Sequence, residues 1–271
     1  MIKFNVISEN RSKDSFCGEA GLSVVIDVDD YRFLLDTGYS DLYTKNAIKM
    51  GIDLTKIQDV IITHGHADHS GGIPYLSNNK RIIMHPSCYK SRWSIRRKIP
   101  MGFVVSESDL VKKHEVITSI DPISIKDNIY FLGEIPMLVE HEKNGNFSTM
   151  LDEELKEIDY TEDDTGVAIK TDKGLVVVTG CGHRGICNTI EHAKKVTGEN
   201  KIYAAFGGFH LRYLDKQREM IDNTIEYFKR NDVKVLFLGH CVTDEVINYF
   251  KEKLCDVKII NIHAGGIFEL N

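Results

Sequence analysis

The sequence is organised around residues 59–72, which read DVIITHGHADHSGG. The run from Val60 to Ile62 is β-branched, and it comes directly before a turn with glycine and polar side chains. Such a run predicts a buried strand that ends at a loop. The loop carries three histidines and one aspartate within positions 64–69. We therefore expect a functional site where this strand ends.

The residue types in this loop predict metal ligation. His64 and His66 are two positions apart, so both can reach one ion from a turn. Asp68 and His69 are adjacent at the start of an expected helix and point in other directions. Neutral imidazole and carboxylate suit zinc, iron or manganese. The spacing thus favours two neighbouring metal positions, one for each pair. The alternative, a polar loop with solvated histidines, explains four closely spaced ligands poorly.

The pattern His-x-His-x-Asp-His after an apolar strand resembles the signature of the metallo-β-lactamase superfamily. The resemblance implies an α/β fold, namely a four-layer αββα sandwich of two pseudo-equivalent halves. Most members are metal-dependent hydrolases with a dinuclear centre. The resemblance therefore implies two divalent metal ions, with zinc preferred and iron or manganese as alternatives.

Composition narrows the class of protein. The 271 residues are 42% hydrophobic and 27% charged, which is ordinary for a globular protein with a sizeable core. A net charge of -6 argues against a general nucleic-acid-binding protein. The six cysteines are scattered, and no signal peptide or membrane-spanning run is evident, so we expect a cytoplasmic protein. A homo-oligomer is compatible with the sequence, which does not determine the oligomeric state.

The chain repeats one arrangement of elements. A hairpin, a strand that ends in a turn, and a helix lead first to His64 and again to His183 and His240. We infer two pseudo-equivalent halves within a single domain over residues 1–271, with an inserted or lid region at about 86–164.

Parts of that region have predictions of their own. Val104 is expected in a short strand, and 152–158 in a helix. The whole of 144–164 is polar and acidic and is interpreted as an insertion over the core.

Other ligands are expected at later strand ends, because the superfamily normally adds a histidine, a bridging aspartate and a last histidine there. His240 fits the last histidine. Cys181 occupies the bridging position, where its thiolate could ligate zinc or iron; a small buried residue filling a tight turn is the alternative. The middle histidine has no clear counterpart. We favour His183 as the ligand, and Asp164 is the alternative ligand. The alternative role for His183 is to support the ligands from outside the metal site or to contact substrate.

Two further residues near the strand ends have predicted roles. His210 follows two glycines that let backbone approach a ligand closely, which favours a substrate contact or a general acid. Asp36 ends an early strand and could orient a histidine through its second ring nitrogen. The remaining histidines are interpreted as structural, with His85 the main exception because it ends a strand beside the motif.

Arginines around the single tryptophan suggest how an anionic substrate could bind. Arg92, Arg96 and Arg97 could hold a phosphate, because guanidinium matches phosphate with two parallel hydrogen bonds. A solvated helix face is an equally good interpretation of this run.

A set of short motifs narrows the family further. The set resembles the branch of dihydropterin-ribofuranosylaminobenzene phosphate synthase-like proteins over nearly the whole chain. The motifs, in order, are EAGLS at 19–23, LDTG at 35–38, THGHADHSGG at 63–72, GCGHRGI at 180–186, GGFHL at 207–211 and GHC at 239–241.

The sequence predicts a metal-dependent hydrolase of a small anionic ester or phosphoester, with Asp68 and His210 as catalytic residues. Asp68 would accept a hydrogen bond from the attacking water, and His210 would donate to the developing oxyanion or leaving group. One alternative is a pterin-type synthase or transferase that condenses a phosphorylated substrate. The other is a ligand-binding module without activity on the same fold.

Overall fold

The computed structural model describes residues 1–143 and 149–271. The chain forms two compact units, each of which contains one seven-stranded sheet and its own helices. Unit 1 comprises Met1–Ser119, Ser148–Asp159 and Ile262–Asn271, and unit 2 comprises Ile120–Phe147 and Tyr160–Asn261.

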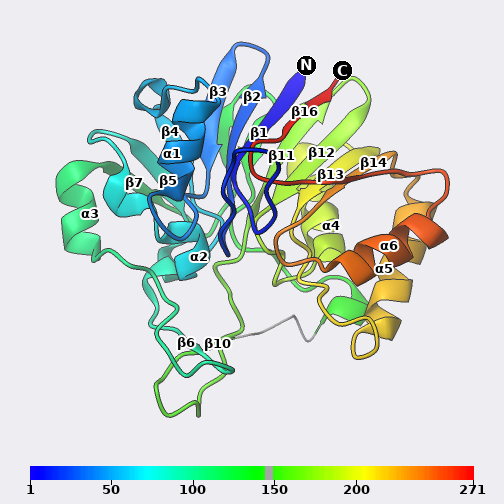
Figure 1. Cartoon of the computed structure of the whole chain (residues 1–271). Coiled ribbons are helices and arrows are strands. Elements are labelled where there is room, and N and C mark those ends of the chain that lie inside the picture. Colours follow the sequence, from blue (N-terminus) through cyan, green and yellow to red (C-terminus); the bar gives the residue numbers. More distant parts are fainter. Residues whose placement is uncertain (144–148) are drawn as a thin grey trace. The chain divides into compact units, whose positions relative to one another are not determined.

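The sheet of unit 1 has the strand order β16-β1-β2-β3-β4-β5-β7. Its first three strands in the chain form antiparallel pairs, and β3, β4, β5 and β7 run parallel to one another. The strand β16 pairs with β1, so the two ends of the chain lie side by side (Figure 1). The strands are β1 (Ile2–Ser8), β2 (Ser23–Val28), β3 (Tyr31–Leu35), β4 (Asp59–Ile61), β5 (Arg81–Met84), β7 (Glu115–Thr118) and β16 (Ile267–Leu270).

The parallel strands of unit 1 are joined through helices, as parallel connections require. These helices are α1 (Leu42–Lys49), α2 (Ala67–Ser70) and α3 (Glu107–Lys113), with short 3-10 turns η1 (Leu54–Lys56), η2 (Ile73–Tyr75) and η3 (Pro86–Tyr89). Their apolar side chains pack with the sheet into one buried cluster that includes Leu34, Tyr43, Val60 and Ile82. The strand β4 is short and fully buried, so it fixes the start of the loop that follows it.

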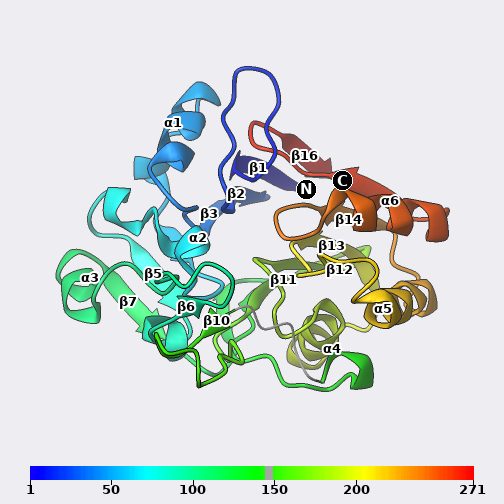
Figure 2. The same ribbon diagram turned by 60° about the horizontal axis from the view of Figure 1, so that its bottom comes forward.

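A separate two-stranded sheet also belongs to unit 1. It pairs β6 (Trp93–Ser94) with β10 (Thr149–Met150), which lie side by side in Figure 2. The pairing places Thr149 opposite Ser94.

The sheet of unit 2 has the order β15-β14-β13-β12-β11-β9-β8. The strands from β12 to β15 are parallel and consecutive, so right-handed connections place their helices on one face of the sheet (Figure 1). The strands are β8 (Ile123–Lys126), β9 (Ile129–Phe131), β11 (Gly166–Thr171), β12 (Gly174–Thr179), β13 (Ile202–Gly207), β14 (Val235–Leu238) and β15 (Lys258–Asn261). The helices are α4 (Ile186–Thr197), α5 (Arg218–Arg230) and α6 (Asp244–Lys253), with the 3-10 turn η4 (Glu140–Glu142).

Most predicted elements are present, and the α/β class with two similar halves is confirmed. The helix predicted over 152–158 is wrong, because this segment is a series of turns. The Asp152 carboxylate accepts hydrogen bonds from the backbone N–H groups of Lys156 and Glu157, which competes with helix formation. Val104 lies in a bend rather than a strand.

The region predicted as an insertion, about 86–164, also differs from the expectation. It supplies β7 to the sheet of unit 1 and β8 and β9 to the sheet of unit 2, so these parts belong to the core sheets. Part of the polar stretch 144–164 lies outside the described residues. In the described parts of the chain, no helix is both long and apolar enough to cross a membrane.

Candidate metal centre

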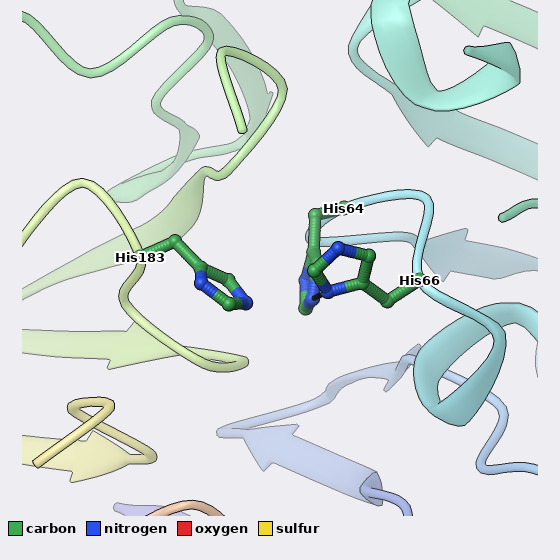
Figure 3. A group of neighbouring side chains, drawn as sticks. All are labelled: His64, His66 and His183. Atoms are coloured by element: carbon green, nitrogen blue, oxygen red, sulfur yellow. Dashed lines mark hydrogen bonds between the residues drawn. The ribbon is translucent and has the colours of Figure 1, made fainter. Parts of the chain in front are cut away.

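The histidine-rich loop begins where β4 ends and continues into α2, as the sequence predicts. His64 and His66 are buried, and Figure 3 shows both rings projecting from this loop. The Nε2 atom of His64 lies 3.0 Å from the Nδ1 atom of His66. Their ring planes are nearly perpendicular, at 78°.

In each ring, the nitrogen that does not face the other histidine contacts a threonine hydroxyl, and this contact determines which ring nitrogen carries the proton. The Thr63 hydroxyl donates to Asp36 at 2.7 Å, so it accepts from His64 Nδ1 at 3.1 Å. The Thr149 hydroxyl donates to Asp159 at 2.8 Å, so it accepts from His66 Nε2 at 2.9 Å. The lone pairs of His64 Nε2 and His66 Nδ1 therefore face each other at 3.0 Å. Two acceptors at this distance repel each other, and a cation beside both would remove the repulsion.

Asp36 holds the start of the loop. Its carboxylate is fully buried and accepts from the Thr63 backbone N–H at 2.8 Å and from the Thr63 hydroxyl at 2.7 Å. The same carboxylate accepts from His69 Nδ1 at 2.7 Å, so the Nε2 atom of His69 presents its lone pair. The prediction that Asp36 orients a histidine is confirmed.

Asp68 and His69 lie in the first turn of α2. His69 is fully buried, and its ring centroid is 4.2 Å from that of His64, whereas Asp68 is partly exposed. Unit 1 thus gathers imidazole and carboxylate donors of the kind that zinc, iron and manganese accept. These residues fit a metal, since each histidine ring is fixed through the nitrogen that would not ligate.

Gly65 is required between the two histidines. A Cβ at this position would lie 2.1 Å from the Cys88 carbonyl oxygen and 2.6 Å from Nη1 of Arg92. Backbone contacts shorter than 3 Å cannot be relieved without moving the loop, so any side chain here would displace the histidines on both sides.

Unit 2 presents a second group of donors at its own strand ends. The Sγ atom of Cys181, after β12, lies 3.2 Å from Nε2 of His240, after β14. Together with Cys241, these residues bring three candidate ligand atoms within 4.8 Å of one another, and all three side chains are buried. The alternative, in which Cys181 only fills a tight turn, does not explain why its sulfur contacts His240.

Cys241 is absent from the set of ligands predicted from the sequence. Its thiol donates to the Cys181 carbonyl oxygen at 3.4 Å, and its sulfur accepts from the His210 backbone N–H at 3.2 Å. The side chain thus connects the loops after β12 and β13. The sequence could have indicated Cys241 only through its position next to His240, and the side chains of adjacent residues usually point in different directions.

His183 and His210 lie next to each other within unit 2. Their ring centroids are 4.3 Å apart, and both are nearly buried. Figure 3 shows His183 on the loop after β12. His210 has φ 49 and His240 has φ 52, in the left-handed region that is uncommon for residues other than glycine. Such backbone strain is concentrated at functional sites.

Asp164, the alternative to His183 as a ligand, supports the loop that carries that histidine. Its Oδ2 atom accepts from the Arg184 backbone N–H at 2.9 Å. Its Oδ1 atom has no hydrogen-bond partner among the described residues. Burial raises the pKa of Asp164 to about 7, against the backbone hydrogen bonds that lower it.

The three predicted anion-binding arginines do not share one environment. Arg96 and Arg97 are exposed, as an anion-binding role requires. Arg92 is 1% exposed, and its Nε donates to Asp159 at 2.7 Å. The geometry therefore corrects the role predicted for Arg92, because its guanidinium is already occupied inside unit 1.

A separate group of donors in unit 2 consists of His141, Glu142 and Cys187. The Glu142 carboxylate accepts from the backbone N–H groups of Cys187 at 3.0 Å and Asn188 at 2.7 Å, so it caps the start of α4. Burial raises the pKa of Glu142 to about 7. These contacts assign Glu142 to the structure of the helix end.

Comparison with known proteins gives consistent matches. A family model described as the metallo-beta-lactamase superfamily matches residues 18–84. The 7,8-dihydropterin-6-methyl-4-(beta-D-ribofuranosyl)-aminobenzene-5'-phosphate synthase of Methanocaldococcus jannaschii is 31% identical over 290 residues, covering 99% of this chain and 96% of its own. A second protein of that organism, MJ0448, is 26% identical and covers 89% of this chain and 90% of its own.

Solved structures agree with the sequence matches. The crystal structure of Tm1679, a metal-dependent hydrolase of the beta-lactamase superfamily, is similar with a TM-score of 0.86 and 30% identity, covering 100% of both chains. A diphosphatase of the PhnP family, at 15% identity and a TM-score of 0.55, shares the fold. The predicted metallo-β-lactamase fold is confirmed. The chain belongs to the metallo-β-lactamase superfamily, in the branch of dihydropterin-ribofuranosylaminobenzene phosphate synthase-like proteins.

Proposed function

We propose that this protein is a metal-dependent hydrolase that cleaves a small anionic ester or phosphoester. One observation supports this most directly: the lone pairs of His64 Nε2 and His66 Nδ1 face each other at 3.0 Å, while their other nitrogens are held by hydroxyl groups. This arrangement favours a cation at the loop. The similarity to a protein described as a metal-dependent hydrolase supports the same reaction class.

The proposed centre holds two divalent ions. His64 and His66 form one group of donors, and Asp68 and His69 form the other. The superfamily resemblance adds Cys181, His183 and His240, and we retain that assignment within the proposal. Zinc is preferred because it accepts imidazole, carboxylate and thiolate alike, and iron and manganese are the alternatives. When bound, such ions supply Lewis-acid activation of water and of the scissile group.

The remaining chemistry is assigned to side chains of the chain itself. Asp68, partly exposed at the start of α2, would accept a hydrogen bond from the attacking water and orient it. His210 would donate a proton or a hydrogen bond to the leaving group. Arg96 and Arg97 would attract the anionic part of the substrate. A small anionic substrate, a cytoplasmic location, no nucleic-acid partner and a homo-oligomer compatible with the sequence remain predictions.

A synthase that condenses a phosphorylated substrate is the second candidate. The observation that favours it is the 31% identity to a protein named as a synthase, over 99% of this chain. Both candidates use an anionic substrate, but only the synthase forms a new bond between two substrates. Product analysis therefore separates them.

The decisive experiment begins with elemental analysis of protein purified without added metal. We expect about two equivalents of zinc, iron or manganese, as dinuclear centres hold. The metal-loaded protein is then assayed against phosphate monoesters, phosphate diesters and carboxylic esters. Hydrolysis of one class that Asp68→Ala abolishes, with an unchanged circular dichroism spectrum, would support the proposal.

The control variant is Asp30→Asn, which changes an exposed carboxylate in the turn between β2 and β3. It is expected to behave as the wild type. Equal turnover by Asp68→Ala and the wild type would refute the role of Asp68. A metal-loaded protein that hydrolyses none of the three classes would favour the synthase or a binding module.

A further inference from the structure

His66 is held differently from the other histidines of its loop. His64 and His69 are oriented by Thr63 and Asp36, which lie at the ends of neighbouring strands in the same sheet. His66 is instead held by Thr149, a residue 83 positions away in the small β6–β10 sheet. Its orientation therefore depends on a part of unit 1 outside the main sheet.

The hydrogen bonds beyond His66 run in one direction. The ring Nε2–H donates to the Thr149 hydroxyl at 2.9 Å, and that hydroxyl donates to Oδ2 of Asp159 at 2.8 Å. A carboxylate accepts hydrogen bonds and does not donate them, so Thr149 has to donate to Asp159, and His66 has to donate to Thr149. The consequence is that the proton of His66 stays on Nε2, and the lone pair stays on Nδ1, which faces His64.

Arg92 completes this network. Its Nε donates to the same Oδ2 atom of Asp159 at 2.7 Å, and its Nη1 donates to the Cys88 carbonyl oxygen at 3.2 Å. Arg92 and Asp159 are 1% and 2% exposed. A buried ion pair contributes little net stability compared with apolar residues of similar size, so its presence beside His66 favours a role in orientation.

We propose that Thr149 and Asp159 are positioning residues for His66, fixing its tautomer and ring so that Nδ1 faces the metal position. Arg92 fixes Asp159 in turn. This inference rests on the proposed metal centre, and it assigns functional importance to the segment 149–159, which no sequence motif indicates. Partners of this kind typically change metal affinity 10- to 100-fold when removed.

The first test compares two substitutions at one position. Thr149→Val removes the hydroxyl and keeps the shape of the side chain, whereas Thr149→Ser keeps the hydroxyl. Zinc affinity is measured by competition with a chromophoric chelator, with no turnover involved. We expect Thr149→Val to bind zinc at least about 10-fold more weakly than the wild type, and Thr149→Ser to stay within about threefold.

A second readout separates positioning from loss of structure. Long-range ¹H–¹⁵N correlation spectra of the imidazole rings report which nitrogen carries the proton. In the wild type, His66 should be protonated on Nε2, and Thr149→Val should give a mixture of tautomers. Asp159→Asn should weaken zinc binding in the same way, whereas Glu153→Gln, which removes a carboxylate at an exposed position of the same segment, should not.

The outcomes distinguish this inference from the proposed function. A wild-type protein that binds no zinc, iron or manganese would overturn both. A wild type that binds metal, with Thr149→Val and Asp159→Asn equal to it in affinity and in the His66 tautomer, would overturn the positioning role alone. Equal weakening by Thr149→Ser and Thr149→Val would also overturn it, because the hydroxyl would then be irrelevant.

Discussion

The carboxylate of Asp36 offers a sharp test of how the loop is organised. It accepts three hydrogen bonds of 2.7 to 2.8 Å, two from Thr63 and one from His69. In Asp36→Asn, one oxygen becomes an NH₂ group, which cannot accept. If the remaining oxygen keeps the Thr63 backbone N–H, the NH₂ group faces the His69 Nδ1–H. The ring then has to move its proton to Nε2, the atom that would ligate.

Two magnitudes follow from this geometry. Two hydrogen bonds to a buried charge are lost, and at about 1.5 kcal/mol each the metal-free protein should lose about 3 kcal/mol of unfolding free energy. Metal affinity should fall about 10- to 100-fold, which corresponds to about 1.4 to 2.8 kcal/mol. The loss of metal affinity also has a contribution from His64, because the Thr63 hydroxyl that orients His64 is itself held by the Asp36 carboxylate.

The assays are urea unfolding in the presence of a chelator, for stability, and chelator competition, for metal affinity. Asp30→Asn is the matched control, since it makes the same chemical change in an exposed turn and should leave both quantities unchanged. Metal affinity in Asp36→Asn equal to that of the wild type would refute the reasoning, because it would show that His69 needs no partner to present Nε2.

Three further predictions use other parts of the chain. Gly65→Ala should cost about 3 kcal/mol of stability and weaken metal binding, because the added Cβ would lie 2.1 Å from the Cys88 carbonyl oxygen. The control Gly51→Ala has open space around its Cβ but φ +70, so it should cost only about 1 kcal/mol. Equal losses of stability in urea unfolding of the two variants would contradict this prediction. With cobalt in place of the native metal, a sulfur-to-metal charge-transfer band should be lost or weakened in Cys181→Ser and unchanged in the control Cys255→Ser. A band of unchanged intensity in Cys181→Ser would exclude Cys181 as a thiolate ligand. Burial raises the pKa of Glu142 from 4.5 to about 7, so this residue's stabilising contribution is complete below pH 4.5 and is lost as the pH rises through 7, by about 3 kcal/mol. Glu142→Gln should flatten that part of the stability–pH curve, and an unchanged slope would show that Glu142 titrates normally.

The sequence predicts most of the elements because their signals are local. Gly198, with φ +70, ends α4 as expected, and the buried β-branched runs form β4 and β12. Local signals fail where side chains compete with the backbone. Asp152 accepts backbone hydrogen bonds and prevents the helix predicted at 152–158. Arg92 belongs to a run of basic residues, and nothing local shows that it alone is buried against Asp159.

By itself, the sequence determined that this protein carries closely spaced candidate metal ligands after a buried strand, because His64, His66, Asp68 and His69 all lie within positions 64–69. Only the tertiary structure decided how those ligands are oriented. Asp36 and His69 are 33 positions apart, and Thr149 and His66 are 83 apart. Hydrogen bonds over such separations depend on strand order and on the packing of loops, which the propensities of neighbouring residues do not encode.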